Sequence, residues 1–419
     1  MRNLYIIHKS SRGSLFGIGT HIATLIKCIE KMGLRITVVT LNDGSVEETT
    51  VEMRHKVRYI QIPNPIYFPL DSQAYQISVG WLLKEFVDEE DENIFHLHRM
   101  DLKSLASVLK HNFSGRVILT MHYSAWSLIL AGDKKRLSRL LSRPANELPP
   151  IEKYVQQSFG EESELMNHYC DKIIAISKHS LESQISIYKV NPDKVILIPN
   201  ALKDTYRPIS RQRKQTLKQK FHIDSGDRVI IFAGRLDEVK GIHFLVHAFK
   251  QILSLYPNTR LILAGDGDLP PVFQSSRYLW NKITFTGFIS RRDLYQLYSI
   301  ADIGVVPSLH EEFGYVAIEM MMHKVPIVVN RTTGLQEIVR DGIDGVHVNL
   351  HPGRIRFKES VNDLTNKLIL LLQDSEAARK MAYNARKIVL RQYNMERFET
   401  QIQALYNQEF SELDRIGDT

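Results

Sequence analysis

Short apolar runs rich in Val and Ile alternate with amphipathic stretches along the 419-residue chain. This alternation is typical of βαβ units, in which parallel strands are buried on both faces of a sheet. The pattern predicts a first series of strands at Leu4–His8, Arg35–Thr40, Val57–Ile62, Ile94–His98, Arg116–Met121, Lys172–Ser177 and Lys194–Ile198. It predicts a second series at Arg228–Ala233, Arg260–Ala264, Lys282–Thr286, Asp302–Val306, Val325–Val329 and Gly345–Val348. We therefore expect an α/β protein with two Rossmann-like domains.

A polar segment separates the two series. Residues 200–227 contain Pro208 and a basic run but no apolar strand, so we divide the chain into domains 1–203 and 204–395. Helical patterns follow the second series, and we expect the last of them, residues 396–413, to return to the first domain. Residues 124–170 are too long for an ordinary connection between a strand and a helix and are interpreted as an insertion.

Composition narrows the class of protein. Hydrophobic residues make up 43% of the chain and charged residues 24%, which excludes a disordered or fibrous protein. Cys28 and Cys170, the two cysteines, form neither a metal-binding pair nor a disulfide framework, so we expect a cytoplasmic protein. No run approaches the roughly 18 apolar residues of a membrane-spanning helix. The net charge of +7 suits anionic ligands or an anionic membrane surface without requiring nucleic acid.

The loops that follow the strands are the expected ligand sites of such sheets. In the second domain, Gly234 and Arg235 follow a buried strand, and Lys240 and Gly241 come shortly afterwards in front of a helix. Arginine binds phosphate oxygens with two parallel hydrogen bonds, lysine adds a point charge, and glycine lets the backbone approach closely. This arrangement suits a diphosphate, although taken alone it is equally compatible with a solvated surface turn.

A second group of polar residues follows the strand that ends at Val306. Glu311 is expected in the loop, and Glu319 about one turn into a helix that begins near Gly314. Carboxylates accept hydrogen bonds from sugar hydroxyls, and the free amides of a helix N-terminus suit a sugar or a phosphate. A pair of glutamates alone is more often a solvated helix face and its cap.

The combination of these motifs resembles a known family, the retaining, nucleotide-sugar-dependent glycosyltransferases of family 4, which have the GT-B fold of two Rossmann-like domains facing a cleft. The resemblance covers nearly the whole chain. It rests on Gly234-Arg235-Leu236, Lys240-Gly241, Pro307-Ser308, the segment from Glu311 to Glu319, and Gly334 with Glu337.

The resemblance implies a role for each motif. Arg235 and Lys240 would hold the donor diphosphate, Glu311 would contact the donor sugar, and Glu319 would contact the nucleotide ribose. The backbone amides of three further residues would meet the sugar hydroxyls and the phosphate; these residues are Phe313, Gly314 and Tyr315.

Four positions depart from the family pattern. Glu312 and Lys324 stand where glycine is usual, and Met320 and Met322 stand where alanine is usual. A bulky residue at position 312 beside the donor sugar would reshape its pocket, so the resemblance leaves the identity of the sugar open.

In the first domain, Gly13, Gly17 and Gly19 are expected in the loop after the first strand, and Gly17 and Gly19 could approach a phosphate or an acceptor closely. Ile22 occupies the third position of a dinucleotide fingerprint, which argues against an NAD enzyme. The resemblance places this loop over the donor diphosphate. His122 follows the strand Arg116–Met121, and the resemblance makes it a functional histidine, so the expected catalytic group is His122, Arg235, Lys240 and Glu311.

Two patterns raise the question of a metal. His96 and His98 face the same side of a predicted strand, but no third ligand is evident. Asp266 and Asp268 have the Asp-x-Asp spacing that binds divalent ions in other glycosyltransferases, whereas the resemblance places a metal-free turn there. We expect neither a metal nor another cofactor.

The insertion contains a basic amphipathic segment, residues 134–143. On a helix, Arg136, Arg139 and Arg143 would share one face and the leucines another. Such a helix could contact an anionic membrane surface, which would make the protein peripheral on the inner membrane face. Alternatively, it is an ordinary surface helix that packs its leucines on the domain.

These observations favour a retaining glycosyltransferase that moves a sugar from a nucleoside diphosphate donor to a hydroxyl acceptor, such as a glycan, a lipid-linked glycan or a small molecule. The first domain would select the acceptor and the second would hold the donor. Two alternatives stay open: a nucleotide-sugar epimerase or phosphorylase-like GT-B enzyme, and a non-catalytic protein that only binds a nucleotide sugar.

Overall fold

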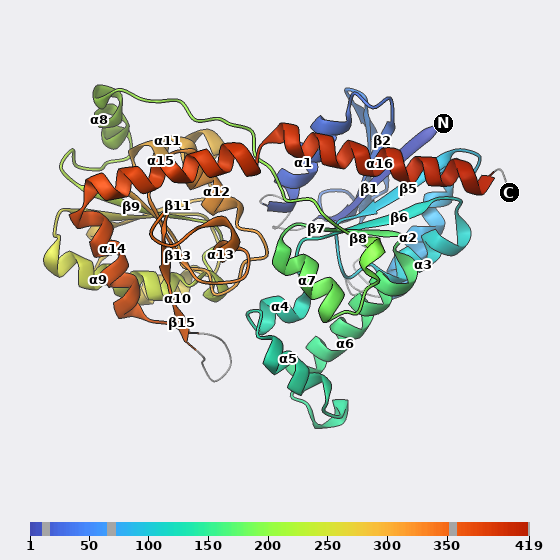
Figure 1. Cartoon of the computed structure of the whole chain (residues 1–419), viewed down its shortest axis with the longest axis horizontal. Coiled ribbons are helices and arrows are strands. Elements are labelled where there is room, and N and C mark those ends of the chain that lie inside the picture. Colours follow the sequence, from blue (N-terminus) through green and yellow to red (C-terminus); the bar gives the residue numbers. More distant parts are fainter. Residues whose placement is uncertain (11–16, 65–72, 352–357, 418–419) are drawn as a thin grey trace. The chain divides into compact units, whose positions relative to one another are not determined.

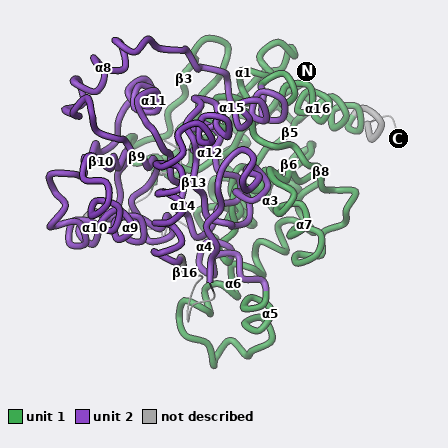
Figure 2. The backbone as a smooth tube through the Cα atoms, turned by 60° about the vertical axis from the view of Figure 1, so that its left-hand side comes forward, with its two compact units in different colours: residues 1–126, 135–201, 395–419 green, residues 127–134, 202–394 purple. Residues whose placement is uncertain are grey.

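The structure, a computed structural model, describes residues 1–10, 17–64, 73–351 and 358–417 (Figure 1). The chain forms two compact units, shown in different colours in Figure 2. Unit 1 comprises residues 1–126, 135–201 and 395–419, and unit 2 comprises residues 127–134 and 202–394. The chain passes from unit 1 to unit 2 after residue 201 and returns to unit 1 at residue 395. Both positions lie next to the expected domain ends, residues 203 and 395. Residues 127–134, expected in the first domain as part of the insertion, group with unit 2 instead.

Unit 1 is built on an eight-stranded sheet with the order β3-β4-β2-β1-β5-β6-β7-β8. All neighbouring strands are parallel except β3, which pairs antiparallel with β4 at the edge. The sequence missed β3 because its side chains are mostly exposed and form no apolar run. The strands are β1 (Arg2–Lys9), β2 (Arg35–Asp43), β3 (Thr50–Arg54), β4 (Val57–Pro63), β5 (Glu92–Leu97), β6 (Arg116–Met121), β7 (Lys172–Ala175) and β8 (Val195–Leu197).

Helices cover this sheet, and the helix nearest the C-terminus is one of them. Phe398, Ile402 and Phe410 of α16 (Met395–Gly417) are buried in one core with Leu4 and Ile6 of β1. The last helix therefore returns to the first domain, as expected from the sequence. The other α-helices between β1 and the end of unit 1 are α1 (Gly17–Ile29), α2 (Gln73–Leu82), α3 (Lys103–Asn112), α4 (Ala125–Ile129), α5 (Lys134–Leu141), α6 (Pro150–Glu164) and α7 (Lys178–Ser186).

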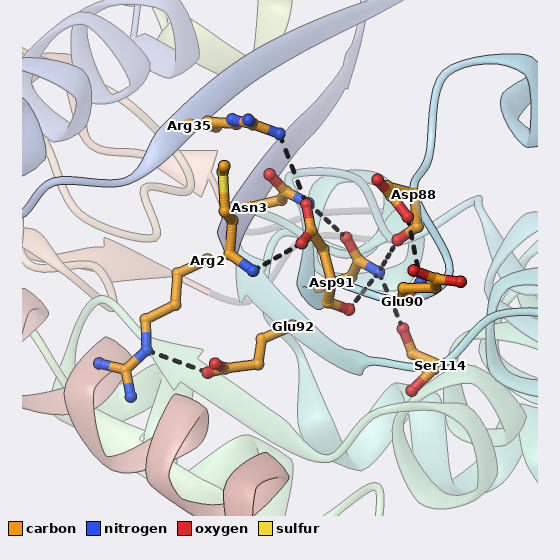
Figure 3. A network of polar contacts seen from close by, with 10 residues as sticks. Arg2, Asn3, Arg35, Asp88, Glu90, Asp91, Glu92 and Ser114 are labelled. Atoms are coloured by element: carbon orange, nitrogen blue, oxygen red, sulfur yellow. Dashed lines mark hydrogen bonds and ion pairs between the residues drawn. The ribbon is translucent and has the colours of Figure 1, made fainter.

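A polar network ties together the amino ends of three strands of unit 1 (Figure 3). The Asp91 carboxylate accepts hydrogen bonds from Asn3 Nδ2 of β1 at 3.1 Å and from Arg35 Nη1 of β2 at 3.5 Å. Arg2 Nε donates to Glu92 Oε2 of β5 at 3.0 Å. The charged residues at these amino ends thus pair with one another.

Unit 2 is built on a six-stranded parallel sheet with the order β11-β10-β9-β12-β13-β14. Its strands are β9 (Arg228–Ala233), β10 (Thr259–Ala264), β11 (Ile283–Gly287), β12 (Ile303–Val306), β13 (Ile327–Asn330) and β14 (Val346–Val348). A small antiparallel pair, β15 (Leu350–His351) and β16 (Lys358–Glu359), was not expected. The α-helices are α8 (Arg211–Lys220), α9 (Ile242–Leu255), α10 (Leu269–Ser276), α11 (Arg291–Ile300), α12 (Tyr315–Met322), α13 (Leu335–Ile338), α14 (Val361–Gln373) and α15 (Ser375–Gln392).

Side-chain caps fix where several helices of unit 2 begin. The hydroxyls of Ser210, Ser290 and Ser360 each accept a hydrogen bond from the amide three residues later, at the starts of α8, α11 and α14. Such a cap satisfies one of the amides that the first helical turn leaves unpaired, and it contributes about 1 kcal/mol.

The apolar face of the basic helix α5 is buried in the protein. Leu137 and Leu140 are buried. Arg136 Nη2 lies 2.8 Å from Glu152 Oε1, and Arg143 Nη1 lies 3.7 Å from Glu152 Oε2. These contacts favour the interpretation of α5 as a surface helix packed on its own unit. Among the described residues, the helices are all too short or too polar to cross a bilayer.

Candidate donor site and histidine cluster

The first two motifs of unit 2 are in direct contact at the carboxyl ends of β9 and β12. Gly241 precedes α9 with a φ of +69°, and a Cβ atom there would lie 2.0 Å from the carbonyl oxygen of Pro307. The amide of Leu309 donates a hydrogen bond to the carbonyl oxygen of Val239 at 2.8 Å. Glycine is therefore required at position 241, because only a residue without a side chain allows the two loops to meet.

Lys240 and Glu311 are brought together by this contact. The ammonium group of Lys240 donates to Glu311 Oε1, which also accepts a hydrogen bond from Ser308 Oγ at 3.0 Å. Both charged side chains stay about one-fifth exposed, at 20% and 18%. Arg235 is more exposed and pairs with Asp237 Oδ2 at 3.1 Å. Two of the predicted cations thus lie at this end of the sheet, one against a predicted carboxylate.

A third loop, which follows β13, donates hydrogen bonds to the loop that carries Glu311. Asn330 Nδ2, at the end of β13, donates to the carbonyl oxygen of Pro307 at 2.8 Å. The Gly334 amide donates to the carbonyl oxygen of Glu311 at 2.7 Å, and the Thr333 hydroxyl donates to the same oxygen. The sequence indicated Gly334 but missed Asn330 and Thr333, although polar residues directly after a buried strand could have pointed to them.

Glu319 lies about one turn into α12, as expected, and it is almost completely buried. Tyr298 Oη donates to Glu319 Oε2 at 3.3 Å. Burial raises the pKa of Glu319 to about 7, against an opposing effect of the Arg291 charge. Its side chain therefore carries a proton for part of the neutral pH range.

The backbone that enters α12 has the geometry needed to present amides. Gly314 has a φ of +100° and precedes the helix. The rings of Phe313 and Tyr315 pack edge-to-face with centroids 5.2 Å apart, and Phe313 is buried. Because the Phe313 ring points into the unit, a ligand at this helix start would meet backbone at that residue.

Glu312, which departs from the family pattern, lies inside unit 2. Its Oε1 lies 3.2 Å from Nε2 of His310, and both side chains are almost completely buried. The carboxylate is therefore occupied by a contact within its own loop.

His122 belongs to a cluster of histidines in unit 1. Its Nε2 lies 3.1 Å from Nδ1 of His98, and its ring centroid lies 4.8 Å from that of His21. Nδ1 of His21 carries a proton, because it lies 2.7 Å from the Oδ1 acceptor of Asn200. Burial lowers the pKa of His98 and His122 well below the usual range and that of His21 to about 4. These imidazoles are neutral at pH 7.

The expectation that His98 lacks further potential ligands was wrong. His21, His98 and His122 place ring nitrogens within 4.8 Å of one another, because α1 and β6 both bring a histidine to the end of β5. Three neutral imidazoles can hold a transition metal. His96 is not part of this group, since the hydroxyls of Tyr406 and Thr120 contact its two nitrogens.

Two other expectations concern glycines and aspartates. Gly17 and Gly19 do not lie in a loop but in the first turn of α1, where the backbone amides have no partner within the helix. Gly13 is outside the described residues.

Asp266 and Asp268 are exposed in a turn after β10, and neither belongs to a three-residue group of metal ligands within the part of the chain that the structure describes.

Two family models match parts of the chain. Residues 17–205 match the family model described as "Glycosyltransferase Family 4", and residues 213–388 match "Glycosyl transferases group 1". The two matches together span most of both units. Both halves of the chain are thus similar to glycosyltransferase domains.

The names of the chain's relatives refer to different molecules. An uncharacterized glycosyltransferase of Methanocaldococcus jannaschii is 34% identical over 182 residues, 42% of this chain and 46% of that protein. The lipopolysaccharide 1,2-N-acetylglucosaminetransferase of Salmonella typhimurium is 30% identical over 224 residues, 50% of this chain and 56% of that protein. The chain thus spans about half the length of these two relatives. A D-inositol 3-phosphate glycosyltransferase of Corynebacterium aurimucosum is 22% identical over 88% of this chain and 85% of its own length.

Solved structures of low sequence identity share the fold of this chain. Sucrose-phosphate synthase from Thermosynechococcus elongatus matches with a TM-score of 0.78 at 21% identity, over 98% of this chain and 100% of that chain. Anabaena HepE in complex with UDP-glucose matches with a TM-score of 0.73 at 19% identity, over 97% of this chain and 100% of that chain. The two Rossmann-like domains expected from the sequence are therefore confirmed as the GT-B fold.

Proposed function

We propose that the chain is a retaining glycosyltransferase that transfers a sugar from a nucleoside diphosphate sugar to a hydroxyl acceptor. The contact between Lys240 and Glu311 carries this proposal, because it joins a diphosphate-binding motif to a sugar-binding motif at one end of the unit 2 sheet. The HepE structures with UDP and UDP-glucose support a nucleotide-sugar donor.

The donor diphosphate would be held by cations and backbone amides. Arg235 would bind phosphate oxygens with two hydrogen bonds, and Lys240 would turn from Glu311 toward the phosphate. Glu311 would then accept a hydrogen bond from the donor sugar. Cations placed in advance stabilise the charge that grows on the departing diphosphate, which is usually the largest contribution to catalysis.

The proposed stereochemistry follows from the tasks of the carboxylates. Glu311 and Glu319 hold hydroxyls, so neither serves as the nucleophile of a double displacement. The acceptor oxygen would attack the anomeric carbon on the face from which the diphosphate leaves. The bond from the anomeric carbon to the phosphate oxygen breaks, the acceptor proton moves to that oxygen, and neutral His122 holds a hydroxyl of the sugar.

The test is the configuration of the product. Donors with different bases and sugars are first ranked by thermal shift, since a donor at 100 times its Kd adds roughly 2.7 kcal/mol of stability. The best donor is then incubated with a panel of hydroxyl acceptors, and the anomeric proton coupling of the product is measured by NMR. We expect an α-linked donor to give an α-linked product. A β-linked product would overturn the proposed mechanism.

Three further measurements separate the alternatives. Conversion of the donor without an acceptor would indicate an epimerase, and donor binding without any turnover would indicate a protein that only binds. We expect activity to survive EDTA, because Arg235, Lys240 and the helix amides supply the positive charge that a metal would otherwise provide. Loss of activity with EDTA and recovery with a divalent ion would show that a metal is required.

A further inference from the structure

Unit 2 contains a cavity of about 670 Å³ at the edge of its sheet opposite the donor motifs. Residues at the amino ends of β9, β12 and β13 contribute to its wall, whereas Arg235, Lys240 and Glu311 follow the carboxyl ends of β9 and β12. Further parts of the wall come from residues 206–210, the start of α8, and the junction between α14 and α15. We call this space the basal cavity. Its volume is in the range of pockets that hold small metabolites.

The wall of the basal cavity is strongly basic. Six cationic side chains line it: Arg207, Arg211, Lys214, Arg228, Lys324 and Arg379. Asp302 is the one carboxylate among the described residues of the wall, and it is already engaged by Lys214 Nζ at 3.1 Å and by the amide of Val229 at 2.9 Å. Like charges gathered in this way repel one another, and an anion in the cavity would relieve that repulsion.

Two of the guanidinium groups are held by neutral partners. Arg207 Nη1 donates to the carbonyl oxygen of Tyr206 at 2.8 Å, and Arg228 Nη1 donates to the carbonyl oxygen of Leu372 at 2.9 Å. Each bond orients a guanidinium group without neutralising its charge. Because guanidinium groups match the geometry of phosphate oxygens, arginines fixed in this way suit a phosphate ligand.

Lys324 supplies an independent observation. It has a φ of +57°, in the left-handed region that favours glycine. A residue other than glycine is strained in this conformation, because its Cβ crowds the backbone. Glycine would make the same turn without strain, so the lysine is costly for the fold. Its ammonium group lies 5.2 Å from the ring centroid of Tyr206, at the wall of the cavity.

The basal cavity is also linked to the candidate donor site. Tyr298 and His323 line the cavity. Tyr298 Oη donates to the Glu319 carboxylate, and Nδ1 of His323 lies 2.8 Å from the Glu319 carbonyl oxygen. A ligand in the cavity would therefore contact residues that position Glu319.

We propose that the basal cavity binds a small metabolite that carries two phosphate groups, and that this site is separate from the donor site. Because the binding surface is complete within unit 2, the proposal does not depend on sugar transfer. The shared chemistry is a pair of phosphate groups, which could come from inorganic pyrophosphate or from a sugar bisphosphate.

The test measures binding by calorimetry with the full chain. To silence the donor site, Arg235 and Lys240 are both replaced by Ala, and inorganic pyrophosphate and a hexose bisphosphate are titrated separately. We expect binding that weakens with salt. Stronger binding of the bisphosphate would identify the sugar ester as the ligand class, and equal binding would identify the phosphate pair itself. Complete loss of binding in the silenced chain would assign the anion to the donor site and overturn the proposal.

Matched variants in the silenced chain locate the ligand. We expect Arg211→Ser and Arg379→Ser each to weaken binding by about tenfold, the effect of removing one charge-assisted hydrogen bond. Arg213→Ser and Lys380→Ser, on the same helices but outside the cavity wall, should leave it unchanged. Equal losses in both pairs would mean that general surface charge, and not the cavity, binds the anion.

Lys324→Gly separates binding from folding. Glycine relieves the backbone strain, so the melting temperature should hold or rise while the affinity for the anion falls. If Lys324→Gly binds the anion as tightly as the parent chain, Lys324 is not part of the site. If Arg211→Ser and Arg379→Ser also bind the anion with unchanged affinity, the proposal is overturned. Circular dichroism of every variant checks that the fold is retained.

Discussion

The contact between Lys240 and Glu311 gives a residue-scale prediction about the donor diphosphate. Because the lysine and Arg235 are proposed to stabilise charge on the leaving group, replacing either with Ala should lower kcat by about 10² to 10³. The measurement is initial rate at saturating donor. Arg277→Ala, which removes an exposed arginine elsewhere in unit 2, is the control. Near-normal turnover by Arg235→Ala would contradict its assignment.

Glu319 predicts how stability changes with pH. Its pKa is about 7 in the folded chain and close to its ordinary value when unfolded, so the folded state binds the proton more tightly. The stability that this proton confers is fully present below the unfolded pKa and is lost as pH rises through about 7. Urea unfolding from pH 5 to 8 should show this loss, and Glu319→Gln should flatten it.

The control for this pH effect is Glu376→Gln, which changes an exposed glutamate on α15. It should leave the dependence on pH as it is in the parent chain. If Glu319→Gln keeps the same slope, another group is responsible for it.

At the scale of elements, the sequence located every strand that lies inside the two sheets. Most of those strands are buried on both faces, so their apolar runs are continuous, whereas β4 is only partly buried and alternates apolar and polar residues. The edge strand β3 and the pair β15 and β16 were missed, because exposed or two-residue strands leave no such run. Helices were predicted where apolar residues recur at helical spacing, as in α14 and α15.

The candidate site was predictable only where residues are close in sequence. The motifs around Lys240 and Glu311 were found, whereas the contact between them depends on how two loops meet. The histidine cluster was missed because His21, His98 and His122 come from three separate elements. The start of α1 was placed too late, since glycines suggested a loop where a helix already begins.

Helix α5 gives a prediction about membranes. Its leucines are buried, and Arg136 and Arg143 contact Glu152, whereas Lys134, Lys135 and Arg139 are exposed. Basic residues near an anionic surface contribute about 1 kcal/mol each, and three of them are fewer than the roughly four to eight found in lipid-binding clusters. We expect the chain to stay in the supernatant when vesicles with anionic lipid are sedimented at 0.15 M salt, the physiological value. Sedimentation that disappears on replacing Arg136, Arg139 and Arg143 with Ser would support a membrane contact instead.

At the scale of the whole molecule, unit 1 depends on α16. Phe398, Ile402 and Phe410 are buried in its core. A chain that ends at Asn394 should therefore lose structure in unit 1 while unit 2, which ends there, keeps its own core. Hydrogen exchange should rise across β1, β2 and β5 and stay low across β9, β10 and β12. Thr400→Ala, on an exposed part of the same helix, should change neither unit. Equal loss of protection in both units would show that they unfold together.

The position of α16 also has a consequence for how the chain is made. A protein is synthesised from its N-terminus, and a domain generally folds once its own residues have left the ribosome. Here the sheet of unit 1 waits for a helix that is made only after all of unit 2. Unit 2 can close around its sheet while β1 still lacks the side chains of α16 that cover it. Leu4 and Ile6 therefore stay uncovered on their α16 side until α16 has been made, and a nascent chain stalled before residue 395 should bind chaperones that recognise exposed apolar strands.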